Sequence, residues 1–201
     1  VSGSVSGEWT SDILYLVDGD LEVSAGETLM IHAGTTIKFL DDHSFNVHGN
    51  LYVMGEEGNE VVFTSGRPIK TEGDWQGIHF VAPGNAYINC QDEFDDQESC
   101  LEVDFCSWQI EQTGEYCYGG GYFDGAGSSV IDHVIIEYAY YGVEYWETDE
   151  DEHVITNSII QYSQSYGIYV NYSANVTISG NTLQNNLYYG IRVSNFSIIN
   201  I

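Results

Sequence analysis

Two clusters of acidic side chains are the residues of this chain best suited to bind a cation. One contains Asp92, Glu93, Asp95, Asp96 and Glu98, and the other contains Glu144, Glu147, Asp149, Glu150, Asp151 and Glu152. Calcium takes several oxygen ligands in a flexible geometry, which closely spaced carboxylates on a loop can supply. Neither cluster has the spacing of an EF-hand loop, and charge runs of this kind are usually solvated surface. The candidate calcium ligands are Asp92, Asp95 and Asp96, and in the second cluster Asp149 and Asp151, with solvated surface as the alternative for both.

Four cysteines lie in the glycine-rich and acidic segment 81–127, namely Cys90, Cys100, Cys106 and Cys117. An even number of cysteines in such a segment predicts two disulfides and an oxidising compartment. Three pairings are open, of which Cys90–Cys100 with Cys106–Cys117 is the simplest. Zinc is the competing interpretation, but no Cys-x-x-Cys spacing occurs. A disulfide-closed loop would pre-organise the first acidic cluster for calcium.

Two further kinds of residue carry a functional hypothesis. Asn171, Asn175 and Asn195 each begin an Asn-x-Ser/Thr sequon, which predicts N-glycosylation in an exported protein. Tyr141, Tyr166 and Tyr189 each precede a glycine in an aromatic-glycine-aliphatic triplet. We expect these rings to stack as a ladder, and the alternative is a stripe that binds sugar or protein.

The elements that position these residues are short strands in a repeat. Segments that begin at Ile131, Ile155 and Ile178 resemble one another, and the differences 155−131 and 178−155 are 24 and 23. Apolar and polar residues alternate with period two in the N-terminal half, and glycines separate the runs. A fixed period of this size predicts stacked coils, each with three short strands.

The register of the N-terminal coils has two solutions. A shift of 16 residues stacks Val47 on Ile31 and aligns His32, His48 and His79 as a metal-like column. A shift of 24 stacks Val47 on Val23 and Phe63 on Phe39, with Val53 near Ile31, and matches the C-terminal period. We favour 24, which disperses the histidines as outward-facing residues: His32, His43, His48, His79, His133 and His153.

The motifs resemble the right-handed parallel β-helix, or pectate-lyase-like, superfamily of secreted proteins. The resemblance covers residues 17–80, including the string from Val23 to Phe39, and residues 128–200 with their Ile-x-x-Asn and Tyr-Gly-Ile segments. It implies an all-β right-handed parallel β-helix of about 24 residues per coil. In such a helix we expect Asn157 and Asn181, with His133 in the equivalent place, to form a hydrogen-bonded ladder at one corner. The superfamily hosts lyases, hydrolases, adhesins and structural proteins, so the resemblance does not select a function.

The sequence favours a non-catalytic protein. A polysaccharide lyase needs a strong base and cationic groups, but the chain has only Lys38, Arg67, Lys70 and Arg192, none in evidently equivalent positions of adjacent coils. A glycoside hydrolase, the more plausible enzyme class, needs two carboxylates about 5–10 Å apart. Glu137 and Glu144 are the candidate pair. Regular threonine arrays of the ice-binding kind are missing.

Charge restricts the partners. The formal net charge is −27, from 31 acidic and 4 basic residues. Nucleic acid is excluded as a partner, because no basic patch can neutralise phosphates. No apolar run is long enough to predict membrane insertion. Cations, neutral glycans, other surface proteins and further copies of the chain are the remaining partners.

These observations predict four segments: an N-terminal arm or cap (1–16), N-terminal coils (17–80), a disulfide-stapled loop insertion (81–127) and C-terminal coils (128–201). The insertion is interpreted either as a binding flap or as a shield over an apolar side of the solenoid. We expect an extracellular or cell-surface structural or adhesive subunit, with calcium as the one candidate cofactor. Because the final coil ends on an apolar strand, the subunits are expected to stack head-to-tail into filaments, unless the chain is a fragment of a longer solenoid. Glycan binding or polysaccharide hydrolysis is the alternative function.

Overall fold

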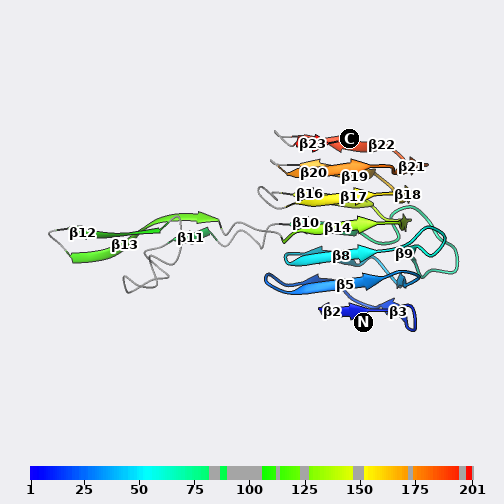
Figure 1. Cartoon of the computed structure of the whole chain (residues 1–201), viewed down its shortest axis with the longest axis horizontal. Helices are drawn as coiled ribbons and strands as arrows, with labels where there is room; N and C mark the ends of the chain where they lie inside the picture. Colours follow the sequence, from blue (N-terminus) through cyan, green and yellow to red (C-terminus); the bar gives the residue numbers. More distant parts are fainter. Residues whose placement is uncertain are drawn as a thin grey trace. The chain divides into compact units, whose positions relative to one another are not determined.

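The chain is a parallel β-solenoid of about six turns, with about 24 residues per coil. The computed structural model describes residues 1–81, 87–89, 106–111, 114–122, 127–146, 152–171, 174–194 and 198–200. Two compact units are present: the solenoid, which comprises Val1–Ala82 and Gly125–Ile201, and a second unit, Pro83–Asp124. Figure 1 shows the solenoid strands stacked from the N-terminal coil to the C-terminal coil.

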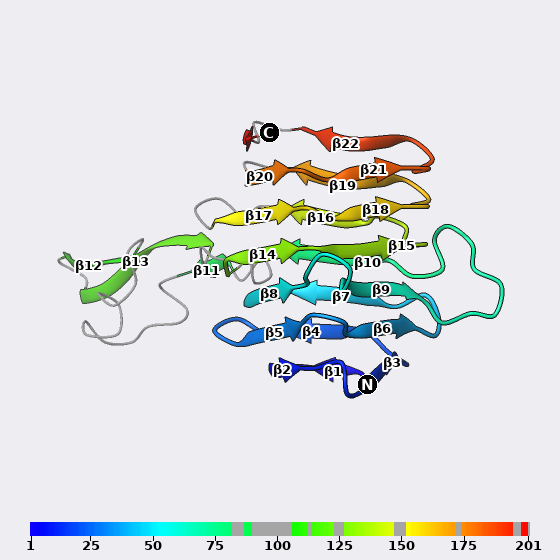
Figure 2. The same cartoon turned by 45° about the vertical axis from the view of Figure 1, so that its right-hand side comes forward.

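Three parallel sheets form the sides of the solenoid, and each coil contributes one strand to each sheet. Sheet A contains β1 (Gly3–Ser4), β4 (Leu21–Val23), β7 (Ser44–Val47), β10 (Gly77–Val81), β16 (Val143–Trp146), β19 (Tyr166–Asn171) and β22 (Tyr189–Val193). Sheet B contains β2 (Gly7–Trp9), β5 (Thr28–His32), β8 (Asn50–Met54), β14 (Ser129–Asp132), β17 (His153–Thr156), β20 (Asn175–Ser179) and β23 (Ile198–Asn200). Sheet C contains β3 (Leu14–Val17), β6 (Thr36–Phe39), β9 (Val61–Ser65), β15 (Val134–Glu137), β18 (Ile159–Gln161) and β21 (Thr182–Gln184). Figure 2 shows the same coils after a 45° turn.

The strand register confirms most of the predicted alignment. Val23 lies beside Val47, Ile31 beside Val53, and Ile131 beside Ile155, which in turn lies beside Ile178. One prediction is wrong, because Phe63 lies beside Ile37 and not beside Phe39. The coil that contains Phe63 is longer, since an additional turn at Glu56–Asn59 separates β8 from β9.

Alternation along each strand decides which side chains fill the solenoid. Inward side chains such as those of Leu29, Leu51, Val47 and Phe63 are fully buried. Their neighbours along each strand are more exposed. Each coil therefore buries its apolar face against the coils above and below it, which a single coil could not do alone. The predicted outward position of His153 is wrong: this residue begins β17 with inward parity and is buried. The histidine column is not formed, as predicted by the 24-residue register, because Met54 lies beside His32, and Asn46 and Glu144 lie beside His79.

A single left-handed residue turns the chain from sheet B to sheet C. His133, Asn157 and Gly180 occupy this position in successive coils, with φ values of 50°, 50° and 68°. Asparagine and glycine tolerate this conformation better than most residues. The predicted ladder is therefore shifted: His133 and Asn157 are equivalent, but Asn181 lies one residue beyond the equivalent position.

Residues 1–17 form the first coil through β1, β2 and β3, which pair with β4, β5 and β6. Trp9 stacks on Tyr15 with ring centroids 4.2 Å apart, which fixes β2 against the start of β3. The second unit contains an antiparallel sheet in the order β11 (Tyr87–Asn89), β13 (Gly114–Tyr122), β12 (Cys106–Glu111), within the segment that we had expected to consist of loops. Within the described part of the chain, no helix has the length and apolarity to cross a membrane.

Candidate functional site

The outward face of sheet A, over β10, β16, β19 and β22, carries polar and aromatic side chains. They form columns along the solenoid, in which each residue lies one coil from the next. The central column is His79, Glu144, Tyr169 and Arg192, which the parallel register places side by side. A second column contains Val81, Trp146 and Asn171. Neighbouring strands of a sheet lie about 4.8 Å apart, so residues in one column are close neighbours. We call this surface the sheet A face.

His79 and Glu144 form a hydrogen-bonded pair on this face. The Nδ1 atom of His79 lies 2.8 Å from Oε2 of Glu144, and the two side chains are only 12% and 14% exposed. A carboxylate oxygen can only accept from the imidazole, so this bond fixes the orientation of the His79 ring. The pair therefore offers a polar group of fixed orientation to a ligand. The sequence did not reveal it, because 65 residues separate its members.

The tyrosine ladder predicted from the triplets is confirmed. Tyr141 stacks on Tyr166 at 5.7 Å between ring centroids, and Tyr166 stacks on Tyr189 at 5.9 Å, with interplanar angles of 13° and 18°. Gly142 and Gly167 follow the first two rings, and a Cβ atom on Gly142 would collide with the backbone of Gly167. Glycine at this position therefore permits the close stacking of adjacent coils at this corner.

The stacking changes what the ladder can offer to a ligand. The faces of the Tyr141 and Tyr166 rings are turned toward neighbouring rings, and the Arg192 guanidinium lies 6.0 Å from the centroid of the Tyr166 ring. A sugar that stacks on an aromatic ring needs an uncovered ring face. The ladder is therefore better suited to donate and accept hydrogen bonds through its hydroxyls than to serve as a stacking platform.

Burial and a nearby carboxylate shift the pKa of Tyr141, which lies beside the His79–Glu144 pair. Burial, and secondly the negative charge of Glu144, raise the pKa of Tyr141 to about 12. The Tyr141 ring also lies edge-on to His79, with centroids 6.4 Å apart. Tyr141 therefore remains a neutral hydrogen-bond donor throughout the physiological range of pH.

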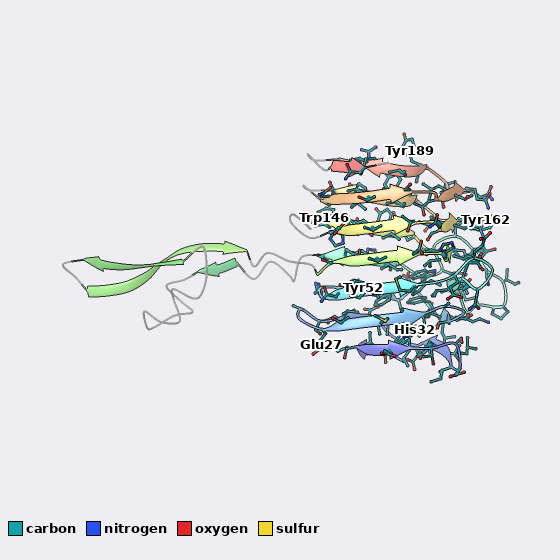
Figure 3. The ribbon with its side chains drawn as sticks, viewed as in Figure 1. Glu27, His32, Tyr52, Trp146, Tyr162 and Tyr189 are labelled. Atoms are coloured by element: carbon teal, nitrogen blue, oxygen red, sulfur yellow. The ribbon has the colours of Figure 1, made fainter. Side chains whose placement is uncertain are left out.

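Side-chain contacts also link β19 with the residue that follows β22 on the sheet A face. The Ser194 hydroxyl donates to Oδ1 of Asn171 at 2.6 Å and lies 3.3 Å from the Tyr169 hydroxyl. Trp146 lies between Val81 and Asn171 in the register, and Figure 3 marks its place in the stack. Neither Trp146 nor Arg192 was singled out from sequence, although both follow the two-residue alternation of outward positions.

Glu137 and Glu144, the candidate hydrolase pair, lie in different sheets. Glu137 ends β15 in sheet C, where it accepts hydrogen bonds from Thr64, Lys70 and Gln161 at 2.8, 3.0 and 3.1 Å. Although burial opposes the shift, these bonds hold the pKa of Glu137 below its ordinary value. Glu144 lies in β16 of sheet A. The two carboxylates therefore do not flank a common site on one sheet.

The remaining predicted site residues are placed only in part. Asp92, Asp95, Asp96, Asp149, Asp151, Cys90, Cys100 and Asn195 lie outside the described residues, as do the side chains of Cys106 and Cys117. Asn171 is buried, whereas Asn175 is exposed. Within the described ranges, no three His, Cys, Asp or Glu side chains are grouped to hold a metal ion.

Comparison with protein families agrees with this architecture. Residues 4–182 match the model of the pectate-lyase like beta helix domain. No curated protein and no solved structure matches the chain. The family match covers most of the solenoid, and its β-helix is the fold described above. The chain therefore belongs to the pectate-lyase-like β-helix family.

Proposed function

We propose that this protein is a non-catalytic adhesive subunit of an extracellular or cell-surface assembly, which binds neutral glycan chains through the sheet A face. The observation that carries the proposal is the half-buried His79–Glu144 pair beside the Tyr141–Tyr166–Tyr189 ladder. Fixed hydrogen-bonding groups repeated at the coil spacing suit an extended polymer with many hydroxyls.

The distribution of charge supports a neutral ligand. All 31 acidic residues lie before residue 153, and residues 153–201 contain one charged residue, Arg192. The β19 and β22 part of the sheet A face thus lies in the least acidic part of the chain. An anionic polymer would be repelled by the rest of the molecule, because the net charge is −27. Neutral sugars experience no such repulsion.

Two features support binding without catalysis. The candidate carboxylates Glu137 and Glu144 lie in separate sheets. Arg67 and Lys70, two of the four basic residues, are paired with carboxylates of Asp74 and Glu137 at 3.0 Å. These pairings reduce the supply of free bases that a lyase requires.

The finer architecture belongs to the same proposal. We infer a right-handed helix, because crossover connections between parallel strands are right-handed in nearly all proteins. We retain the pairing Cys90–Cys100 with Cys106–Cys117, calcium at the two acidic clusters, and glycosylation at the exposed Asn175. Peptide mapping under non-reducing conditions would identify the disulfides.

Affinity electrophoresis in gels that contain soluble neutral polysaccharides tests the proposal. The panel would comprise cellulose, β-1,3-glucan, xylan, mannan and chitin derivatives. We expect retardation of the wild type by at least one polymer, reduced at least tenfold in affinity by His79→Ala combined with Tyr169→Ala. Tyr52→Ala, on the outward side of sheet B, is the matched control and should bind normally. Absence of retardation, or equal binding by all three proteins, would overturn the assignment.

Self-association is a second candidate function, favoured by the coil β21–β23. Leu187 and Tyr188 are 67% and 65% exposed there, and Leu183, Ile191 and Ile199 are only partly buried. Exposed apolar side chains favour association with another copy or another surface protein. Light scattering after size exclusion would show assemblies that Leu187→Glu dissolves. A monomeric mass at all concentrations would contradict this candidate.

A further inference from the structure

Two polar side chains interrupt the inward, apolar column of sheet B. The inward column of sheet B runs Leu29, Leu51, Ser129, His153 and Val176. Ser129 and His153 therefore replace aliphatic side chains in two successive coils. The exposed fractions of these residues are 0% and 1%. A polar pair inside such a column costs stability unless its polar atoms are hydrogen-bonded.

The imidazole of His153 is held by one hydrogen bond and two rings. Its Nδ1 atom lies 2.8 Å from the Ser129 hydroxyl. Its ring centroid lies 4.9 Å from that of Tyr145 and 5.5 Å from that of Phe80, both of which point inward from sheet A. Its Nε2 atom is buried and has no hydrogen-bond partner within the described part of the structure. A neutral ring fits this environment, whereas a charged ring would expose a second N–H donor to an apolar core.

Among the described residues packed on His153, no side chain offers a counter-charge to an imidazolium. Of the groups packed on it, Ser129 of β14 and Phe80 of β10 carry no charge, and Tyr145 of β16 is a phenol whose pKa burial raises further. Val176, its neighbour in β20, is aliphatic. Burial alone lowers the pKa of His153 to about 4. His79 and Glu144 point to the opposite, outward side of the same strands β10 and β16.

We propose that His153 is a built-in acid sensor, whose protonation destabilises the two successive coils that contain β14 and β17. The sign follows from the two states. An unfolded chain protonates its histidines near pH 6.5, whereas the folded chain holds His153 neutral to about pH 4. The stability of the fold is therefore complete above pH 6.5 and declines as pH falls toward 4. The decline in the folding equilibrium constant is about 15-fold between pH 6.5 and 5, and about 150-fold between pH 7.5 and 4.

The large net negative charge has the opposite effect on how stability depends on pH. Protonation of surface carboxylates relieves mutual repulsion in a protein of net charge −27, which acts in the opposite direction. Comparison of a His153 variant with the wild type cancels that contribution, because both chains carry the same carboxylates.

Urea unfolding of the whole protein at pH 7.5, 6.5, 5.5 and 5.0 tests the proposal. We expect the folding equilibrium constant of the wild type, divided by that of His153→Leu, to fall about 30-fold between pH 7.5 and 5.0. His153→Gln keeps a hydrogen-bonding side chain and serves if the leucine variant does not fold. His48→Gln, a half-buried histidine bonded to the Val81 carbonyl, is the control and should follow the wild type. Parallel pH profiles for wild type and both His153 variants, or an NMR titration of the His153 ring near pH 6.5, would overturn the proposal.

Discussion

Asn181 and Asn186 make the same pair of hydrogen bonds at two successive corners of one coil. The side-chain oxygen of each accepts from the backbone N–H of a serine in the preceding coil, Ser158 at 2.9 Å and Ser163 at 3.0 Å. The side-chain nitrogen of each donates to a carbonyl, Ile155 at 2.8 Å and Ile160 at 3.1 Å. Each asparagine thus satisfies one donor and one acceptor where the chain leaves its strand, and this links two coils at the corner.

Replacement of Asn181 by alanine should therefore destabilise the solenoid. We expect a loss of about 1–3 kcal/mol in the free energy of unfolding, because a backbone N–H and a carbonyl lose their partners. Chemical denaturation measures the change. Gln184→Ala is the control, since its amide bonds another exposed side chain, Gln161, and its loss should stay within about 0.5 kcal/mol. Equal effects of the two substitutions would show that the corner bonds are not important for stability.

The ladder predicts a graded response to tyrosine removal. Tyr166 stacks on both Tyr141 and Tyr189, whereas Tyr189 stacks on Tyr166 only. At about 0.5–1.5 kcal/mol per aromatic pair, Tyr166→Ala should cost about 1–3 kcal/mol and Tyr189→Ala about half as much. Thermal unfolding monitors both. Tyr166→Phe keeps the ring and should remain close to wild-type stability, and a large loss in this variant would mean that the hydroxyl, not stacking, holds the ladder together.

The raised pKa of Tyr141 gives a test by titration. With a pKa of about 12, only about one tenth of Tyr141 is ionised at pH 11. Since the fold favours the neutral phenol, the stability from this group is complete below pH 10 and is lost as pH rises through 12. Ring-carbon NMR, assigned with Tyr141→Phe, follows the ionisation. Glu144→Gln should lower the pKa, and an unchanged value would show that Glu144 does not act on this ring.

Asp74 should be a sensitive polar residue of the segment 66–76. It is 1% exposed and accepts hydrogen bonds from Ser65, Arg67 and Thr71. Burial by itself raises the pKa of Asp74, but these hydrogen bonds hold that pKa below its ordinary value of 3.8. Asp74→Ala should cost about 3 kcal/mol, because three donors lose their acceptor.

The pH dependence of Asp74 has the same sign as that of His153, but it lies at lower pH. Its contribution is present above pH 3.8 and is lost as pH falls through the lowered pKa. Asp41→Asn is the matched control, since exposed Asp41 also pairs with Arg67 and should matter less. A loss for Asp41→Asn as large as that for Asp74→Ala would contradict the importance of burial.

Local pattern predicted much of the fold but few of the contacts at the candidate site. Two-residue alternation and the 24-residue period predicted the inward positions of Val47 and Val53 and the stack of Tyr141 on Tyr166, because both depend on spacing along the chain. Phe63 was placed on the wrong neighbour, since the alignment took no account of the turn at Glu56–Asn59.

The His79–Glu144 pair and the inward position of His153 depend on long-range geometry. The segment from Pro83 to Asp124 interrupts the repeat between His79 and Glu144 and hides the equivalence of β10 and β16. His153 starts its strand directly after a run of acidic residues, so its sequence context indicates surface. The alternation along β17 nevertheless turns His153 inward, because Ile155 points inward and His153 lies on the same side of the strand.

The most direct test of the central claim is hydrogen exchange of the whole protein with and without the neutral polysaccharide that retards it most. If the sheet A face binds the polymer, amides of β10, β16, β19 and β22 should gain protection, and those of β5, β8, β6 and β9 should not change. Protection confined to sheets B and C, or to the β21–β23 edge, would contradict the proposed binding face.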